Sequence, residues 1–219
     1  MDIHSIDERE MMVKKLGRKE AQEVTRTRLI EVATRVFTRY GFERASVETI
    51  AQEVGMTKGA VYANFATKED LFLAVLDRVM NQEDQMLETI LVEPTSTRID
   101  ALRTYFVNAF THSQDWRLLV TEFWLHAARN PTLRQQYALR YQKRRKKIAQ
   151  FIEQYLAEEG RKGLLSSEVF ASVIIAVSHG LEMQHIIDSE TIPDDLFATV
   201  LSLFVQQLSQ PNSSLDVFP

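Results

Sequence analysis

The groups best suited to hydrogen bonding with an external partner lie in one short stretch, residues 57–68. Their hydroxyl, ammonium and amide groups belong to Thr57, Lys58, Tyr62, Asn64 and Lys68. Hydroxyl and ammonium groups donate to phosphate oxygens, and threonine and asparagine side chains also pair with the edges of bases. Gly59 has no side chain and would let a phosphate approach the backbone closely. The stretch therefore predicts contacts with the backbone and bases of a nucleic acid.

Two short helices are expected to position these groups. Ser46 can cap the first helix, and Gly55 ends it because glycine adopts positive φ without strain. The apolar residues of this helix share one face at helical spacing: Val47, Ile50, Ala51 and Val54. Thr57 can cap the second helix. Two helices joined by such a turn form a helix-turn-helix, whose second helix enters the major groove of DNA. Ser46 and Gly59 join the five donors as predicted DNA contacts.

A surface helix of a purely structural bundle is the alternative interpretation, and the charge distribution argues against it. Residues 9–68 carry 12 Lys and Arg against 7 Asp and Glu, whereas residues 69–219 carry 14 against 20. The whole chain has a net charge of −4. A basic front on an acidic body is typical of a DNA-binding domain joined to a second domain.

The stretch G-M-T-K-G-A-V-Y-A-N-F-A-T-K-E-D-L-F, preceded by F-x-x-x-G-F-x-x-A-S-V-x-x-I-A, resembles the tetracycline-repressor (TetR) family. The resemblance covers residues 25–76. Asn64 stands where the family frequently has histidine, and Ala63 where a second aromatic residue is usual. The resemblance implies a homodimeric transcriptional regulator, most often a repressor. It would be released from a palindromic double-stranded DNA operator by a small apolar or aromatic ligand.

Composition excludes several other classes of protein. The chain has no cysteine, so it has neither disulfides nor thiolate metal ligands. We expect no membrane span and no signal peptide, hence a cytoplasmic location. The sequence contains no phosphate-binding glycine loop and no G-x-S-x-G motif, and nothing in it indicates a cofactor. An enzyme and a DNA-binding protein without a ligand remain the alternatives to a ligand-controlled regulator.

Apolar periodicity predicts an all-α protein with two domains. We expect a flexible basic arm at 1–24, a helix-turn-helix domain at 25–70, a helical ligand-binding and dimerisation domain at 71–210, and a tail at 211–219. The predicted helices beyond the helix-turn-helix are 67–92, 98–112, 116–129, 131–159, 166–188 and 193–209. The charged run 143–147 is interpreted as a solvated helix face.

The second domain offers a candidate ligand pocket rich in aromatic residues. Its predicted lining is Phe106, Phe110, Trp116, Phe123, Trp124, Tyr137, Tyr141, His179 and Met183. A metal site at His179, Glu182 and His185 is a weaker alternative, because helical zinc ligands more often lie four residues apart.

Small residues at 172, 176 and 180 recur every four positions and would allow close helix packing, either within one chain or between two copies. The resemblance implies that the last two helices form a dimer interface. The predicted interface residues are Ser172, Ala176, Gly180, Phe197, Leu201 and Phe204.

Overall fold

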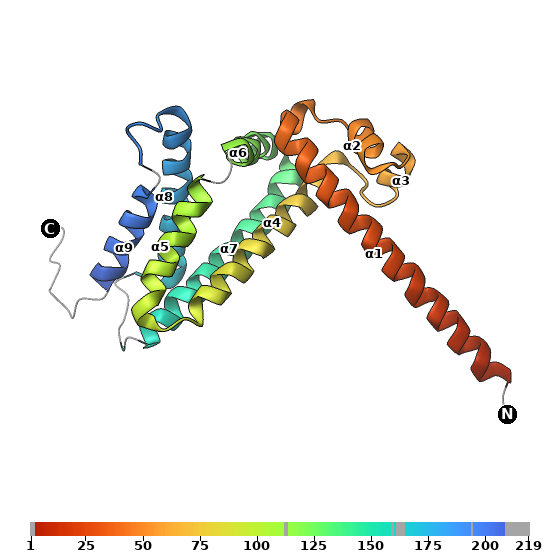
Figure 1. Cartoon of the computed structure of the whole chain (residues 1–219), viewed down its shortest axis with the longest axis horizontal. Coiled ribbons are helices and arrows are strands. Elements are labelled where there is room, and N and C mark those ends of the chain that lie inside the picture. The colour runs from red at the N-terminus through yellow and green to blue at the C-terminus, as the bar shows by residue number, and fades with distance from the viewer. Residues whose placement is uncertain (1–2, 112–113, 159, 161–164, 194, 209–219) are drawn as a thin grey trace. The chain divides into compact units, whose positions relative to one another are not determined.

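The computed structural model describes residues 3–111, 114–158, 160, 165–193 and 195–208, and every regular element in these ranges is an α-helix. The side chains of residues 3–16, Phe106 and Phe110, among others, are not described. The helices are α1 (Ile3–Arg44), α2 (Val47–Val54), α3 (Lys58–Tyr62), α4 (Lys68–Leu91), α5 (Thr95–Thr111), α6 (Gln114–Arg129), α7 (Pro131–Glu158), α8 (Ser167–Ile187) and α9 (Leu196–Leu208) (Figure 1). The predicted all-α class is confirmed.

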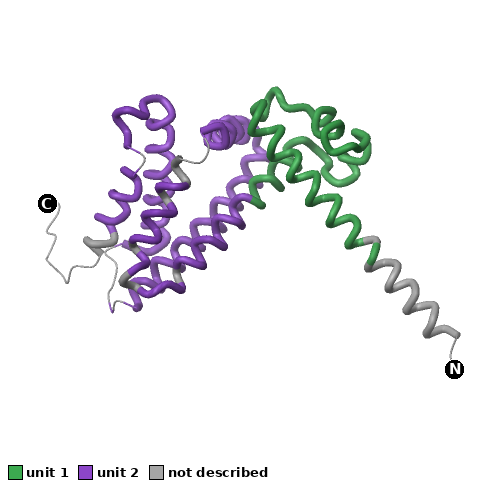
Figure 2. The backbone as a smooth tube through the Cα atoms, viewed as in Figure 1, with its two compact units in different colours: residues 1–78 green, residues 79–219 purple. Residues whose placement is uncertain are grey.

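The chain forms two compact units, which Figure 2 distinguishes by colour. Unit 1 is Met1–Arg78 and unit 2 is Val79–Pro219. The division falls within α4, eight residues beyond the boundary predicted at 70, because the first turns of this helix complete the core of unit 1. Residues 71–76 are all buried there.

Unit 1 is built on a cluster of three phenylalanine rings. Phe37 and Phe42 stack at 5.8 Å, and Phe72 meets both rings edge-on at 5.2 and 5.4 Å. Gly41 allows Phe42 to turn back onto this cluster, since its φ of 78° interrupts the helix between the two rings. Edge-to-face aromatic packing of this kind stabilises a small core beyond the area that it buries.

The first residues of the chain differ from the predicted arm. Helix α1 begins at Ile3, so the region predicted as an aperiodic arm is helical over residues 3–24. Good helix formers such as lysine, glutamate and alanine explain the helix, and the described side chains of residues 17–24 are exposed. The flexibility of this segment and its contact with DNA stay predictions.

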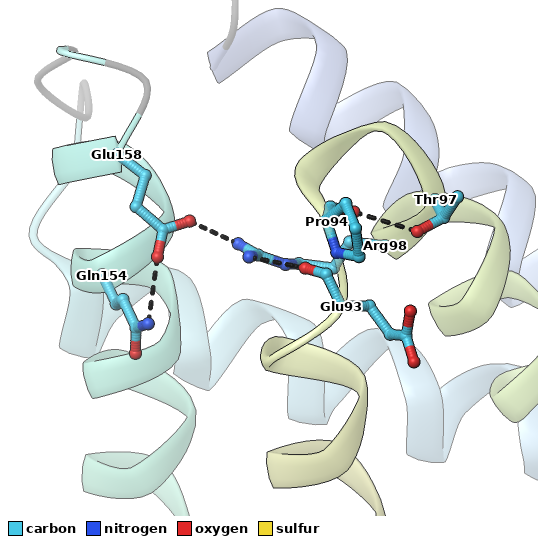
Figure 3. Close-up of polar contacts among 6 residues, drawn as sticks. All are labelled: Glu93, Pro94, Thr97, Arg98, Gln154 and Glu158. Atoms are coloured by element: carbon cyan, nitrogen blue, oxygen red, sulfur yellow. Dashed lines mark hydrogen bonds and ion pairs between the residues drawn. The ribbon is translucent and has the colours of Figure 1, made fainter.

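In unit 2, α7 contacts α6 and α8, while α9 contacts α5 and α8. Arg98 anchors the start of α5 between two helix ends (Figure 3). Its guanidinium donates to the Glu93 carbonyl at 3.0 Å and to a Glu158 carboxylate oxygen at 2.6 Å. Only 5% of Arg98 is exposed, so this ion pair is partly buried.

The helices predicted from apolar periodicity are present, with small shifts at their ends. Beyond the helix-turn-helix, the starts of two helices shift by three residues: α5 is predicted from 98 and begins at Thr95, and the last helix is predicted from Pro193 and begins at Leu196. Pro193 instead accepts a hydrogen bond from the Leu196 amide in the turn before the helix. The predicted tail at 211–219 lies outside the described residues.

Candidate nucleic-acid interface

Two capped helices and a glycine turn form the candidate site. Ser46 Oγ accepts from the Thr49 amide at 3.0 Å, and Thr57 Oγ1 accepts from the Ala60 amide at 3.2 Å. Gly55 takes the left-handed conformation (φ 74°, ψ 35°) at the end of α2. The Met56 amide then bonds the Ala51 carbonyl at 2.8 Å, which closes the turn. The predicted helix-turn-helix geometry is confirmed.

Helix α3 has one buried face, which belongs to the core, and one exposed face, which carries the candidate contact residues. Val61 is 1% exposed and packs into unit 1, whereas Thr57, Lys58, Gly59 and Tyr62 are exposed on the outer side. Tyr62 keeps 43% of its surface in solvent. A helix with hydroxyl and ammonium donors on one exposed face suits contact with phosphate groups.

Lys58 is held at the centre of this face. Its ammonium pairs with Glu48 of α2 and lies 5.9 Å from the centre of the Tyr62 ring. The hydrogen bond with Glu48 raises the pKa of Lys58 and lowers that of Glu48, so both groups are charged at neutral pH. A phosphate that binds Lys58 must therefore compete with Glu48.

Gly59 has no internal reason to be glycine. A Cβ atom there would meet only Thr57 Oγ1, at 3.9 Å, and its backbone does not have positive φ. Glycine within a helix costs about 1 kcal/mol relative to alanine. An external partner that approaches the backbone closely would explain the residue.

Three residues predicted to contact DNA hold the fold of unit 1. Lys68 donates to the Phe42 and Ala45 carbonyls at 2.9 and 3.2 Å, and its ammonium lies 4.4 Å from the Phe42 ring. The Nδ2 of Asn64 donates to the Ala60 carbonyl at 2.9 Å, at the end of α3. The Ser46 hydroxyl caps α2. The Lys68 ammonium at the start of α4 thus donates to carbonyls at the end of α1 and just beyond it.

Arg26 is a positioning residue that the sequence alone did not reveal. Its guanidinium lies 4.1 Å above the Phe65 ring and donates to the Asn64 carbonyl at 3.0 Å. The contact joins α1 to the segment after α3 over 38 residues of sequence, so no local pattern could indicate it.

The candidate ligand residues of unit 2 separate into three groups. Phe123 and Tyr137 are core residues, 0% and 6% exposed, whose rings meet at 5.7 Å. Tyr141 and His179 continue this row at more accessible positions, with ring distances of 5.2 and 5.8 Å. Of the remaining predicted residues, Trp116 is half-buried, and Trp124 and Met183 are exposed. The side chains of Phe106 and Phe110 lie outside the described part of the chain.

The sequence pattern did not predict the ion pairs that charged residues of α7 form with α4. Arg144, within the run interpreted as a solvated face, donates to Glu83 of α4 at 2.6 Å. Lys147 pairs with Asp84 and Glu88 at 3.2 and 2.8 Å. Only Lys143 and Lys146 of the run are exposed as predicted. Five consecutive residues cover every side of a helix, so some of these charged side chains must face the neighbouring helices.

The predicted dimer residues are also divided. Ala176 and Gly180 are exposed on α8 and Ser172 is half-buried there. On α9, Phe197 is 2% exposed and belongs to the core of unit 2, while Phe204 packs edge-on against Phe170 at 5.6 Å. Leu201 is half-buried.

The metal alternative finds no geometric basis in the described residues. His185 Nδ1 lies 2.8 Å from the Ile192 carbonyl, and His179 contacts Tyr141 on another side of the helix. Within the described ranges, no group of three or more His, Asp or Glu could hold a metal ion.

Known proteins match both units. A family model described as "Bacterial regulatory proteins, tetR family" matches residues 29–75, and "BetI-type transcriptional repressor, C-terminal" matches residues 98–210. The chain is 32% identical over 93 residues to the transcriptional regulator TtgR of Pseudomonas putida. That match covers 42% of this chain and 44% of TtgR, less than half of either.

Two solved structures illustrate the likeness in fold. A transcriptional regulator from Saccharomonospora viridis in complex with choline has a TM-score of 0.66 at 21% identity, covering 84% of this chain and 96% of that one. FadR from Bacillus subtilis in complex with stearoyl-CoA has a TM-score of 0.64 at 17% identity, with coverage of 84% and 96%. At these identities the likeness establishes a shared helical fold.

Proposed function

Because the chain belongs to the tetR family of bacterial transcriptional regulators, we propose that it is a homodimeric repressor of a palindromic operator, released by a small apolar or aromatic effector. The family supports DNA binding and control of transcription. Repression, the dimer and the effector are the finer parts of the proposal. We expect the protein in the cytoplasm, where its DNA is.

The exposed face of α3 is the observation that carries the proposal. It presents Thr57, Lys58 and Tyr62 around a glycine that the fold itself does not require. Hydroxyl and ammonium donors would bind phosphates, and the Gly59 backbone would fit against the groove. Recognition helices at a spacing set by a two-fold axis would then favour half-sites about one helical turn or more apart.

Footprinting of the purified protein on DNA upstream of its own gene tests this function. We expect a protected palindrome whose affinity falls as salt rises. Tyr62→Phe should lose a hydrogen bond to phosphate of roughly 1–3 kcal/mol. Lys58→Ala should weaken binding to all sequences and flatten the salt dependence by about one counterion. Unchanged affinity in both variants would place DNA binding on another surface.

The exposed face of α8 supports the dimer. Val169, Met183 and Ile187 are 48%, 40% and 83% exposed, on the same side as Ala176 and Gly180. An apolar face of this extent in one helix is typical of an interface, and a second copy would cover it through the same residues. By length and composition α8 is the one described helix that could cross a membrane, but a single such helix is weak evidence for a membrane protein.

A bulky side chain on this face tests the dimer. A Cβ atom at Gly180 meets nothing within 4 Å, so Gly180→Leu should leave the folded subunit intact while it separates two closely packed helices. We expect monomers in analytical ultracentrifugation and a steep loss of operator affinity. Ala138→Leu, at an exposed site on α7, is the control and should remain dimeric. A normal dimer in Gly180→Leu would move the interface elsewhere.

The effector is inferred from the residues of this chain. The two similar structures contain choline and stearoyl-CoA, which differ widely in size and polarity, so the fold does not specify the ligand. The row from Phe123 to His179 offers aromatic surface that suits an apolar or aromatic molecule. Operator release by such a molecule would distinguish this regulator from a DNA-binding protein without a ligand, and turnover of the molecule would indicate an enzyme.

A further inference from the structure

The aromatic row of unit 2 ends in a chain of polar groups on one face of α7. Tyr137, Tyr141 and Arg144 recur at i, i+4 and i+7 and so lie on the same side of the helix. The Tyr137 and Tyr141 rings lie 5.2 Å apart, and burial, followed by the interaction with Tyr141, raises the pKa of Tyr137. The Tyr141 hydroxyl in turn lies 3.4 Å from His179 Nδ1.

His179 lies at the end of this row and contacts the Tyr141 hydroxyl. A neutral imidazole carries one N–H and one acceptor nitrogen, so His179 can contact the Tyr141 hydroxyl through Nδ1 and still keep its second ring nitrogen for a ligand. Burial, and then the charge of Arg144, lower the pKa of His179 and keep the ring neutral at physiological pH. The His179 residue is exposed, so its neutral ring can contact a ligand.

Arg144 adds a fixed positive charge with hydrogen-bonding capacity to spare. Its side chain is 25% exposed, and in the described part of the chain it makes one hydrogen bond, to Glu83. A guanidinium has five N–H donors and binds a carboxylate best through two of them in parallel. Because Glu83 uses only one of these N–H groups, a ligand carboxylate that forms two parallel bonds could replace it.

The Glu182 carboxylate, which lies near Tyr141 and Arg144, is a weaker acceptor than an ordinary glutamate. The Glu182 carboxylate already accepts from Ser178 Oγ at 3.1 Å. Burial and the nearby charge of Glu83 raise the pKa of Glu182, which reduces its repulsion of an anion. Glu182 therefore opposes an anion less than an ordinary carboxylate would, and the guanidinium of Arg144 favours an acidic ligand over a cationic one once it is released from Glu83.

We propose that the effector is an aromatic acid, whose ring packs beside Tyr141 and whose carboxylate takes Arg144 from Glu83. The proposal depends on the proposed function, since it names the class of effector. Glu83 lies on α4, and the Arg144 pair is one of the ion pairs that hold this helix to α7. A ligand carboxylate that displaces Glu83 would loosen that contact, and the same competition would make effector binding depend on Glu83.

Three probes that share one ring and one linker test the inference: 3-phenylpropanoate, 3-phenylpropanamide and 3-phenylpropylammonium. Calorimetry on the full-length dimer should show propanoate binding at least about tenfold more tightly than the amide, as expected for a charged pair. Arg144→Gln should abolish this preference. Lys143→Gln removes the same charge from the exposed side of α7 and should retain it.

Glu83→Gln supplies an independent arm that does not depend on the stability of the Arg144 variant. Because it removes the competitor, it should tighten propanoate binding several-fold and leave amide binding unchanged. Equal or tighter binding of the amide or the ammonium compound would overturn the inference. So would an acid preference that survives Arg144→Gln, propanoate that binds no better to Glu83→Gln, or no propanoate binding at millimolar concentration.

Operator affinity, measured separately, distinguishes this inference from the proposed function. Propanoate that binds through Arg144 without changing operator affinity would support the acid site and remove effector release from the proposed function. If only the amide or the ammonium compound releases the operator, the proposed function would stand, since an effector controls DNA binding. The preference for an acid would then be wrong.

Discussion

The two units differ in how their interiors accommodate charge. In the described part of unit 1 every buried residue is apolar, with the Phe37, Phe42 and Phe72 rings at its centre. Unit 2 instead buries Asp84 and Arg98, which are 9% and 5% exposed, and places Arg144 between helices. The unit that carries the candidate DNA-contact face thus has a core without buried charges.

This difference suits different tasks. A close-packed apolar core has one good arrangement, because any shift opens voids or forces overlaps. Partly buried ion pairs contribute little net stability, since the loss of hydration nearly offsets the attraction. A new partner can therefore exchange such pairs at small cost. The core of unit 1 thus favours one arrangement, whereas the ion pairs of unit 2 would allow the proposed response to an effector.

The largest effect should come from Phe72→Ala, which removes one of the three rings in unit 1. We expect a loss of about 3–5 kcal/mol in the free energy of unfolding, from lost burial and the cavity left behind. Both tryptophans, Trp116 and Trp124, lie in unit 2 and report on it alone. In urea, circular dichroism should show an earlier transition while tryptophan fluorescence keeps its midpoint.

Phe123→Ala is the matched variant, because Phe123 is 0% exposed in unit 2. It should move the fluorescence transition instead. If Phe72→Ala shifts both signals together, the units unfold as one and the comparison between them loses its basis in stability.

Smaller effects are expected from the ion pair between Glu83 and Arg144. Glu83→Leu leaves Arg144 without its partner and should cost roughly 1–3 kcal/mol in the free energy of unfolding. The double variant Glu83→Leu/Arg144→Met should be close to the unaltered protein, because apolar residues of similar size can replace such a pair. Thermal denaturation measures both. A double variant as unstable as the single one would mean that unit 2 depends on its charges for stability.

Gly59→Ala should separate stability from function in unit 1. The added methyl group meets only Thr57 Oγ1 at 3.9 Å, so the helix should gain up to about 1 kcal/mol from its better propensity. Operator affinity should nevertheless fall about tenfold, roughly 1.4 kcal/mol, because the backbone can no longer approach DNA as closely. Fluorescence anisotropy with labelled operator checks the affinity. Full affinity in a stabilised variant would remove Gly59 from the interface.

The smallest effect concerns the Glu158 carboxylate of unit 2. Hydrogen bonds from Arg98 and then Gln154 lower its pKa below the ordinary value of 4.5. A lowered pKa in the folded state contributes stability above pH 4.5 that is lost as pH falls through the folded-state pKa. The difference in Tm between the unaltered protein and Glu158→Gln should therefore be present at pH 7 and shrink below pH 4.5. A difference that stays constant with pH would assign it to packing alone.

The sequence by itself determined the helices and the helix-turn-helix. Caps at Ser46 and Thr57 and the break at Gly55 depend on residues within a few positions of one another, so local chemistry identifies them. Apolar periodicity likewise located the helices of unit 2. The class of the protein followed from the same local signals, since the stretch from Gly55 to Phe72 combines caps, turn and donors in one place.

Only the tertiary structure decided which polar groups are available for binding. Lys68 and Lys58 are both lysines in the same stretch, yet the first bonds the end of α1 and the second is exposed. Arg144 and Lys143 are neighbours, and one pairs with α4 while the other is exposed. Helical geometry shows that adjacent side chains point to different sides of a helix. The residue that each side chain meets there comes from a distant part of the sequence. The energy of a charge depends on that partner and on its distance from water, and both are set only when the helices pack.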